Sequence, residues 1–248
     1  MFENYIFDLY GTLVDIRTNE SKASLWKYMA DYMTLQGAPY SAAELRKRYR
    51  NLVGVLCREQ YEKKKHLFLA LTADQIEVNV SEVFSRLYGE KSVEATPQML
   101  ADLALMFRVV SLKYVRLYEG AIPLLKELRR RRKGVYLLTN AQRLFTEPEL
   151  RSLGIYELFD DVMISSDVGF KKPSLQFYGA LLTKHGLDPK TSVMIGNDGQ
   201  ADAWGAHNCG LSCMYIRTLQ SPAFTGELPQ GCICLKNISD VLETYVRL

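Results

Sequence analysis

The chain has 248 residues, of which 48% are hydrophobic, and its formal net charge is +3. This length suits one large domain or two modest ones, and the composition supplies enough apolar side chains for a core. The small net charge gives no reason to expect nucleic acid or an anionic membrane as a partner. The sequence contains neither a run of about 18 apolar residues nor a signal-peptide pattern, so we expect a cytoplasmic protein without a membrane span.

The first residues form a short apolar run that ends on an acid. Residues 4–7 predict a buried strand, and Asp8 follows directly, before a turn at Gly11 and Thr12. In open α/β sheets, ligands bind outside the carboxyl ends of the strands. Asp8 in that place can act as a nucleophile or hold a cation, whereas a purely structural Asp would end the strand and start a turn. This stretch alone leaves both interpretations open.

Residues 20–118 have a different character. Apolar residues recur there at helical spacing in four segments, of which the last covers residues 96–118. Ser41 is followed three residues later by Glu44, which is the pattern of a capping box at a helix N-terminus. Because almost none of the alternation typical of strands occurs in this stretch, we expect residues 17–114 to form an inserted helical domain.

After Gly120 the patterns of helices and strands alternate. Strands are predicted at residues 135–140, 161–166, 192–198, 212–217 and 231–235. Helical patterns separate them, and a last helix is predicted at the C-terminus. This alternation is typical of a parallel, doubly wound sheet with helices on both faces. We therefore expect residues 1–16 and 115–248 to form one Rossmann-like α/β core.

Polar side chains follow four of the predicted strands. They are Asp8, Thr12, Thr139, Asn140, Lys172, Asn197, Asp198 and Asp202. Each of them alone could belong to an ordinary turn, but the carboxyl ends of parallel strands share one edge, so we expect these groups to meet. A nucleophilic carboxylate, a hydroxyl and a lysine that bind the oxygens of a transferring group, and an acidic cluster that holds Mg²⁺ suit phosphoryl chemistry.

Four stretches resemble the motifs of the haloacid dehalogenase superfamily of hydrolases. They are FDLYGTLVD at 7–15, LLTN at 137–140, GFKKPSLQFY at 169–178 and IGNDGQADAWGA at 195–206. Their order matches that of the family motifs, and the resemblance covers the whole predicted core. The helical insert resembles the family's cap, which implies that it closes over the site and sets substrate choice. Closure would exclude water and strengthen the charge interactions inside.

The resemblance implies catalytic roles for the matching residues. Asp8 would be the nucleophile that becomes a covalent aspartyl intermediate. Thr139 and Lys172 would bind the oxygens of the phosphoryl or equivalent group. Asn140 would help to position the substrate, and Thr12 would contribute to substrate binding.

The resemblance also implies a Mg²⁺ site, formed by Asp8, the backbone carbonyl of Tyr10 and an acid of the last motif. Asn197 stands where the family usually has Asp, but Asp198 follows it, so a metal ligand remains available. Whether Asn197 or Asp198 is that ligand stays open at this point. Asp202 either contacts the metal or stabilises the lysine.

Tyr10 is a second departure from the pattern of the family's phosphatases, which usually have a general acid and base Asp at this position. A phenol with an ordinary pKa of about 10 is a poor proton shuttle at neutral pH. The 2-haloacid dehalogenases of the family resemble this chain in carrying Asp-x-Tyr-Gly-Thr, and a halide leaving group needs no proton.

Three functions follow from these observations. The favoured one is a Mg²⁺-dependent phosphatase of a small phosphorylated metabolite. The second is a metal-independent 2-haloacid dehalogenase, which Tyr10 and Tyr178 suit and for which Arg46, Arg48 and Arg50 are halide-binding candidates by composition alone. The third is a non-catalytic binding or regulatory protein that keeps the fold. In each case we expect a small molecule as partner and a monomer or homodimer.

Overall fold

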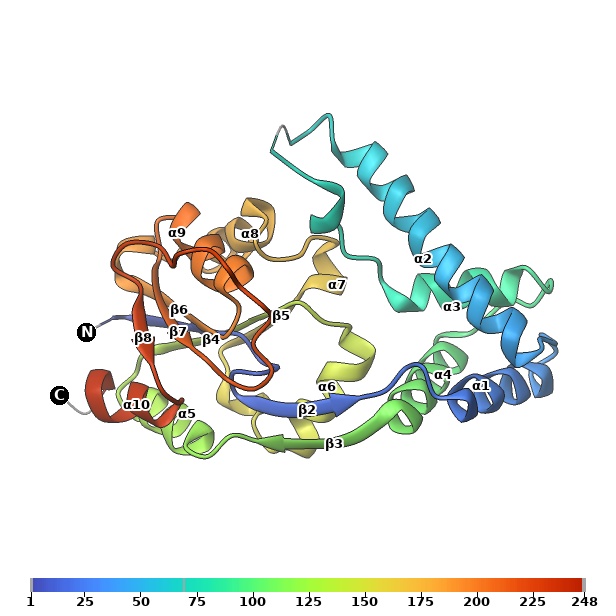
Figure 1. Cartoon of the computed structure of the whole chain (residues 1–248), viewed down its shortest axis with the longest axis horizontal. Helices are drawn as coiled ribbons and strands as arrows, with labels where there is room; N and C mark the ends of the chain where they lie inside the picture. The colour runs from blue at the N-terminus through green and yellow to red at the C-terminus, as the bar shows by residue number, and fades with distance from the viewer. Residues whose placement is uncertain (1, 69, 247–248) are drawn as a thin grey trace.

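The computed structural model describes residues 2–68 and 70–246. Its core is a six-stranded parallel sheet with the strand order β5-β4-β1-β6-β7-β8 (Figure 1). The strands are β1 (Asn4–Phe7), β4 (Gly134–Thr139), β5 (Asp161–Ile164), β6 (Ser192–Gly196), β7 (Ser212–Ile216) and β8 (Ile233–Leu235). The predicted α/β fold is thereby confirmed, and the first strand of the chain lies inside the sheet between β4 and β6.

Helices cover both faces of this sheet because successive side chains of a strand point to opposite sides. Tyr5 and Phe7 of β1 pack into a cluster with α5 (Ala121–Arg130), whereas Ile6 packs into another cluster with α8 (Leu175–His185). The remaining helical elements of the core are α6 (Arg143–Ser152), α7 (Ser165–Val168), α9 (Gly205–Asn208), α10 (Ser239–Val241), the 3₁₀ turns η2 (Tyr156–Leu158) and η3 (Pro189–Thr191), and the π-helical turns η4 (Gly199–Trp204) and η5 (Leu242–Val246).

Four helices lie to one side of the sheet and form a hydrophobic cluster of their own (Figure 1). They are α1 (Ala23–Leu35), α2 (Ala42–Lys64), α3 (Val80–Gly89) and α4 (Pro97–Ser111), with the short turn η1 (Ala73–Gln75) between α2 and α3. One of the two bonds of the predicted capping box is present, because the Ser41 hydroxyl accepts a hydrogen bond from the Glu44 amide at the start of α2. The Glu44 carboxylate binds Lys91 instead. None of the helices in the described ranges is long and apolar enough to cross a membrane.

A two-stranded antiparallel ribbon connects the four helices to the core. It consists of β2 (Val14–Thr18) and β3 (Leu112–Leu117). The helical pattern predicted for residues 96–118 is therefore wrong at its end, because α4 stops at Ser111. The pairing partner of β3 lies about a hundred residues earlier in the chain, where local periodicity cannot reveal it. Both predicted domain boundaries, after residues 16 and 114, fall inside this ribbon.

Candidate active site

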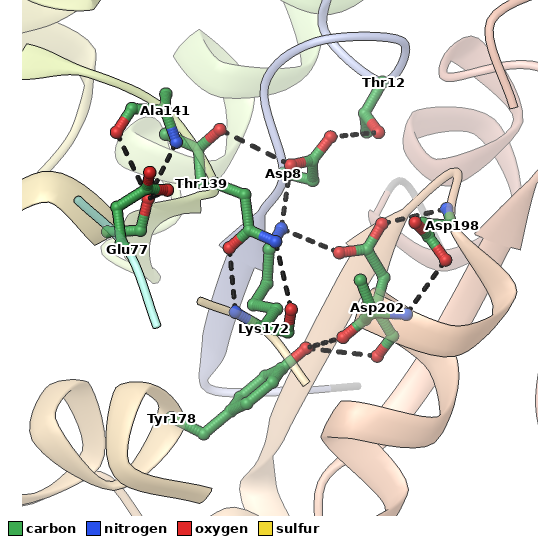
Figure 2. A network of polar contacts seen from close by, with 12 residues as sticks. Asp8, Thr12, Glu77, Thr139, Ala141, Lys172, Tyr178, Asp198 and Asp202 are labelled. Atoms are coloured by element: carbon green, nitrogen blue, oxygen red, sulfur yellow. Dashed lines mark hydrogen bonds and ion pairs between the residues drawn. The ribbon is translucent and has the colours of Figure 1, made fainter. Parts of the chain in front are cut away.

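The centre of the site is a buried lysine between two carboxylates (Figure 2). The Lys172 ammonium lies 2.8 Å from Oδ1 of Asp8 and 2.7 Å from Oδ1 of Asp202. Asp8 follows β1, Lys172 lies in the loop between α7 and α8, and Asp202 belongs to η4, which follows β6. Asp8 and Asp202 are 194 positions apart in the sequence. They lie close together because β1 and β6 are neighbours in the sheet. The predicted convergence at this edge of the sheet is thus observed.

Burial and charge determine how Lys172 and Asp202 hold their protons. The exposed fractions are 7% for Asp8, 4% for Lys172 and 2% for Asp202. Burial disfavours the charged lysine, but the carboxylates of Asp202 and Asp8 outweigh it and raise the pKa of Lys172. Burial raises the pKa of Asp202, because the lysine offsets only part of the desolvation and Asp8 adds a second negative charge. Lys172 is therefore held as an ammonium between the two acids.

Two hydroxyl groups fix the carboxylate of Asp8. Thr12 donates to its Oδ2 at 3.1 Å, and Thr139, at the end of β4, donates to its Oδ1 over a longer contact of 3.5 Å. The loop between Asp8 and Thr12 turns at Gly11, where φ is +85° and a Cβ atom would lie 2.1 Å from Nδ2 of Asn197. Only glycine fits this position, which lets the loop pass directly over Asn197.

Asn140 holds the lysine loop by its backbone. Its side-chain oxygen accepts the Lys172 amide hydrogen at 2.8 Å, and its side-chain nitrogen donates to the Lys172 carbonyl at 3.0 Å. Both polar ends of the Asn140 side chain are therefore used inside the protein. In this structure Asn140 therefore positions Lys172, while it also lines the cavity, and its role in positioning substrate stays a prediction.

The acids of the last motif differ in what they bind. Oδ1 of Asp198 accepts the backbone amides of Gln200 and Ala201 at 2.8 and 2.9 Å and so caps η4. The Asp198 amide in turn donates to Oδ2 of Asp202 at 3.0 Å. Tyr178 of α8 fixes the same turn, because its hydroxyl donates to the carbonyls of Ala201 at 2.9 Å and of Asp202 at 3.2 Å (Figure 2). Asp202 thus contacts the lysine, as one of the two sequence interpretations has it.

The side chain of Tyr10 is engaged with a separate polar group, which we call the Tyr10 cluster: Tyr10, Arg108, Thr146 and Glu149. The phenol donates to Oε2 of Glu149 at 2.5 Å and lies 3.1 Å from the hydroxyl of Thr146. Arg108 of α4 donates to Oε1 of the same carboxylate, also at 2.5 Å. Burial, followed by the negative charge of Glu149, raises the pKa of the Tyr10 phenol. Sequence reasoning did not detect this cluster, because nothing local relates Arg108 of α4 to Glu149 of α6.

The segment between η1 and α3 brings a second undetected carboxylate to the site. Oε2 of Glu77 accepts the Ser165 hydroxyl at 2.7 Å, and Oε1 accepts the side-chain amide of Gln142 at 2.9 Å. The Ser165 oxygen also accepts the amide hydrogen of Ala141, the residue after Asn140 (Figure 2). Burial raises the pKa of Glu77, and hydrogen bonds from Ser165 and Gln142 offset this only in part.

Backbone hydrogen bonds support the same connection. The amide of Lys171 donates to the carbonyl of Gln75 at 2.7 Å, and the amide of Glu77 donates to the carbonyl of Gly169 at 3.3 Å. The four-helix segment is therefore bonded to the loop that carries Lys172 as well as to the loop that carries Asn140. The position of the four-helix segment and the geometry of the site therefore depend on each other through these two loops.

A cavity of about 150 Å³ opens above these groups. Of the nine residues predicted for the site, of which Tyr10 was predicted through its backbone carbonyl, Thr12 is the one absent from the described lining. The lining residues are Asp8, Tyr10, Thr139, Asn140, Lys172, Asn197, Asp198, Ala201, Asp202, Gln220 and Pro222. It contains three carboxylates but one ammonium, so its charge is negative.

Residues 2–210 match a family model described as haloacid dehalogenase-like hydrolase. The chain belongs to this family. The family predicted from the four motifs is thereby confirmed, and Asp8, Thr139, Lys172 and Asp198 of these motifs line one cavity.

The hydrolase is similar to both phosphatases and dehalogenases. A glyceraldehyde 3-phosphate phosphatase of Methanothermobacter thermautotrophicus is 26% identical over 148 residues, which cover 60% of this chain and 66% of that protein. A phosphoserine phosphatase of Thermus thermophilus is 31% identical over 133 residues, which cover 53% of each chain. Among solved structures, a 2-haloacid dehalogenase of Pseudomonas syringae superposes with a TM-score of 0.66 at 17% identity and covers 100% of this chain and 99% of its own. The matches to the two phosphatases thus span between about half and two thirds of their lengths, and the structural match establishes the fold alone.

Proposed function

We propose that this hydrolase removes phosphate from a small phosphorylated metabolite through an aspartyl-phosphate on Asp8, with Mg²⁺ as cofactor. The observation that carries the proposal is the charge of the cavity. Its one ammonium, on Lys172, is already bonded to two carboxylates, and Asp198 adds a third negative group. A phosphate dianion would be repelled from such a cavity unless a divalent cation entered with it. The two phosphatase relatives support the same reaction class.

The residues present fit Mg²⁺. This ion is usually held by one or two carboxylates together with water and phosphate oxygens, so it does not need a cage of protein ligands. Within the described residues, no three side chains of His, Cys, Asp or Glu are grouped as such a cage. Asp8 and Asp198 both line the cavity, and Asp198 uses Oδ1 for the amides of η4, which leaves Oδ2 for a cation. The carbonyl of Tyr10 is the third proposed ligand. When bound, Mg²⁺ would supply positive charge to the phosphate oxygens.

In the proposed mechanism an oxygen of Asp8 attacks the phosphorus atom. The bond from phosphorus to the substrate oxygen breaks, and that oxygen leaves with the electron pair and takes a proton from water. The Lys172 ammonium and the Thr139 hydroxyl, which contact Asp8 in the free protein, bind the phosphoryl oxygens as the charge moves onto them. Asn140 keeps Lys172 in position through its two backbone hydrogen bonds. Water then attacks the phosphorus and releases phosphate and free Asp8.

We also propose that residues 17–114 act as the cap over this site, joined to the core by the β2–β3 ribbon. The Glu77 contacts and the Arg108–Glu149 ion pair would hold the cap against the core. In that position it would keep bulk water away from Asp8 and strengthen the charge interactions inside the cavity.

Dehalogenation is less well supported, because a 2-haloacid carries a carboxylate and releases a halide, both of which need cationic or donor partners. The described lining of the cavity contains no arginine. Of the candidates Arg46, Arg48 and Arg50, none belongs to that lining, and Arg48 forms an ion pair with Glu90.

The test is hydrolysis of 4-nitrophenyl phosphate with and without Mg²⁺, with the Asp8→Asn variant as blank. The proposal expects metal-dependent release that the variant abolishes. Release that is equal in the variant would remove Asp8 from the role of nucleophile. Should no release occur in either condition, chloride release from small 2-chloro acids would decide between a dehalogenase and a non-catalytic protein.

A further inference from the structure

Two cysteines occupy neighbouring positions at one edge of the core sheet. β7 and β8 are parallel neighbours, and β8 is the last strand on that side (Figure 1). Met214 pairs with Ile233, so the residues before them, Cys213 and Cys232, stand beside each other. Both cysteines pack into the hydrophobic cluster on the α8 face of the sheet, whereas Met214 and Ile233 pack into the cluster on the α5 face. The two thiols therefore lie on the same face of the sheet.

The spacing of this pair suits a disulfide. Neighbouring strands lie about 4.7–4.9 Å apart, and a disulfide joins cysteines whose Cα atoms are about 4.4–6.8 Å apart and whose side chains point the same way. Both thiols are free. A hydrogen bond between them lowers the pKa of Cys213 and raises that of Cys232. The fold thus holds the two sulfur atoms together before any oxidation.

The other cysteines are placed differently. Cys57 lies in the four-helix segment, where its thiol donates to a backbone carbonyl at 3.4 Å. Burial alone raises the pKa of Cys209, which follows α9. Cys234 is exposed and stands opposite Tyr215 of β7. Among the cysteines that the structure describes, the remaining two are therefore the pair in adjacent register.

This pair stands at the base of the loop between β7 and β8, which forms part of the candidate active site. Gln220 and Pro222 of the loop line the active-site cavity. The Thr218 hydroxyl donates to the carbonyl of Gly11 at 2.9 Å, which ties the loop to the turn after β1. A bond between the two cysteines would close residues 213–232 into a ring and fix the separation of the two ends of the loop.

We propose that Cys213 and Cys232 form a reversible disulfide, which makes the base of this loop an oxidation-sensitive site, with glutathione disulfide as oxidant. Cys232 is partly exposed and Cys213 is 5% exposed, so exchange begins at Cys232. Its thiolate attacks one sulfur of glutathione disulfide, the bond between the two glutathione sulfurs breaks, and one glutathione leaves with the electron pair and takes up the proton that Cys232 lost. Cys213 then attacks the Cys232 sulfur in the same way and releases the second glutathione. Two thiols are oxidised, and one glutathione disulfide is reduced to two glutathione molecules.

The experiment maps the bridge in the full chain after incubation with excess glutathione disulfide. Trypsin leaves Cys209 on the same peptide as Cys213, and Cys234 on the same peptide as Cys232. The double variant Cys209→Ser with Cys234→Ser is therefore the protein under test, because each of the two peptides then carries one cysteine. After free thiols are alkylated with N-ethylmaleimide, mass spectrometry without reduction should find the two peptides joined and two alkyl groups lost from each chain. Excess reduced glutathione should restore both thiols.

Several outcomes would overturn the inference. Chains that keep both thiols free, or that carry glutathione on Cys232 without a bridge, would show that the folded geometry does not let the two sulfur atoms bond. Bridges to Cys57 as frequent as those formed in guanidinium chloride would show that the fold does not select the pair. A bridge that reduced glutathione does not open would contradict its reversibility. Cys232→Ala is the matched control, because it removes the thiol that is attacked first, and we expect Cys213 to stay unmodified in it. If this variant does not fold, the double variant alone still decides.

Discussion

Asp8 and Tyr10 are two residues apart, yet their side chains belong to opposite kinds of polar environment. Around Asp8, two carboxylates share one ammonium beside an open cavity, so negative charge remains. Around Tyr10, one carboxylate meets one guanidinium and the phenol, so the charges balance. The comparison shows that a buried polar group with excess charge marks where a ligand can bind, whereas a buried polar group whose charges cancel stabilises the fold. The following changes test each side.

The largest expected effect comes from removing the nucleophile. Asp8→Asn keeps the size of the side chain but takes away the covalent route, so we expect hydrolysis of 4-nitrophenyl phosphate to fall by ~10⁴-fold or more. The circular dichroism spectrum and the thermal unfolding midpoint should stay close to those of the wild type. Activity near the wild-type level would contradict the role of Asp8.

The second change removes the shared ammonium. Lys172→Met leaves Asp8 and Asp202 buried beside each other without their counter-charge, so we expect loss of activity together with ~3–5 kcal/mol of unfolding free energy. The double variant Lys172→Met with Asp202→Asn should recover most of the stability but none of the activity. Urea unfolding and hydrolysis assays separate the two effects. A single variant as stable as the wild type would argue against the ion-pair geometry.

The third change tests the Tyr10 cluster, in which the charges cancel. Arg108→Met leaves the Tyr10 phenol as the described side-chain partner of the Glu149 carboxylate, and we expect a loss toward the lower end of ~3–5 kcal/mol, measured by urea unfolding. Lys27→Met is the matched control, because Lys27 pairs with Asp31 on an exposed helix surface. There we expect no measurable change. Equal effects of the two variants would mean that the Tyr10 cluster contributes nothing special to stability.

The smallest expected effect concerns Glu77, whose charge is buried between the helical segment and the core. Because its pKa is raised on folding, the folded state holds this proton more tightly than the unfolded state does. Stability should therefore fall as the pH rises from the ordinary Glu value toward the folded value, and the penalty should persist above it. Glu77→Gln removes this dependence, so its unfolding free energy relative to the wild type should increase between about pH 4 and pH 7. Urea unfolding at several pH values measures it, with Glu94→Gln as control, because Glu94 is exposed. A difference that is constant with pH would contradict the assignment.

The limits of sequence reasoning are clearest at particular residues. The strand before Asp8, the alternation after Gly120 and the polar residues at the strand ends are local patterns, and each is found where it was predicted. Strand β3 was mistaken for the end of a helix, since its identity depends on pairing with β2. The bond from Asn140 to the backbone of Lys172, 32 residues later, was not predicted, because the two residues meet only in the folded chain.

By itself the sequence determined the α/β core, the helical insert and the set of residues that meet at the sheet edge. Hydrophobic periodicity and the alternation of strands and helices can be recognised in short windows of the sequence. Only the tertiary structure decided the direction in which Tyr10 points, the capping role of Asp198, and the contacts of Arg108 and Glu77 with the core. These features depend on which distant side chains lie within hydrogen-bond distance and on how much water is excluded there. Neither quantity is a property of a sequence window.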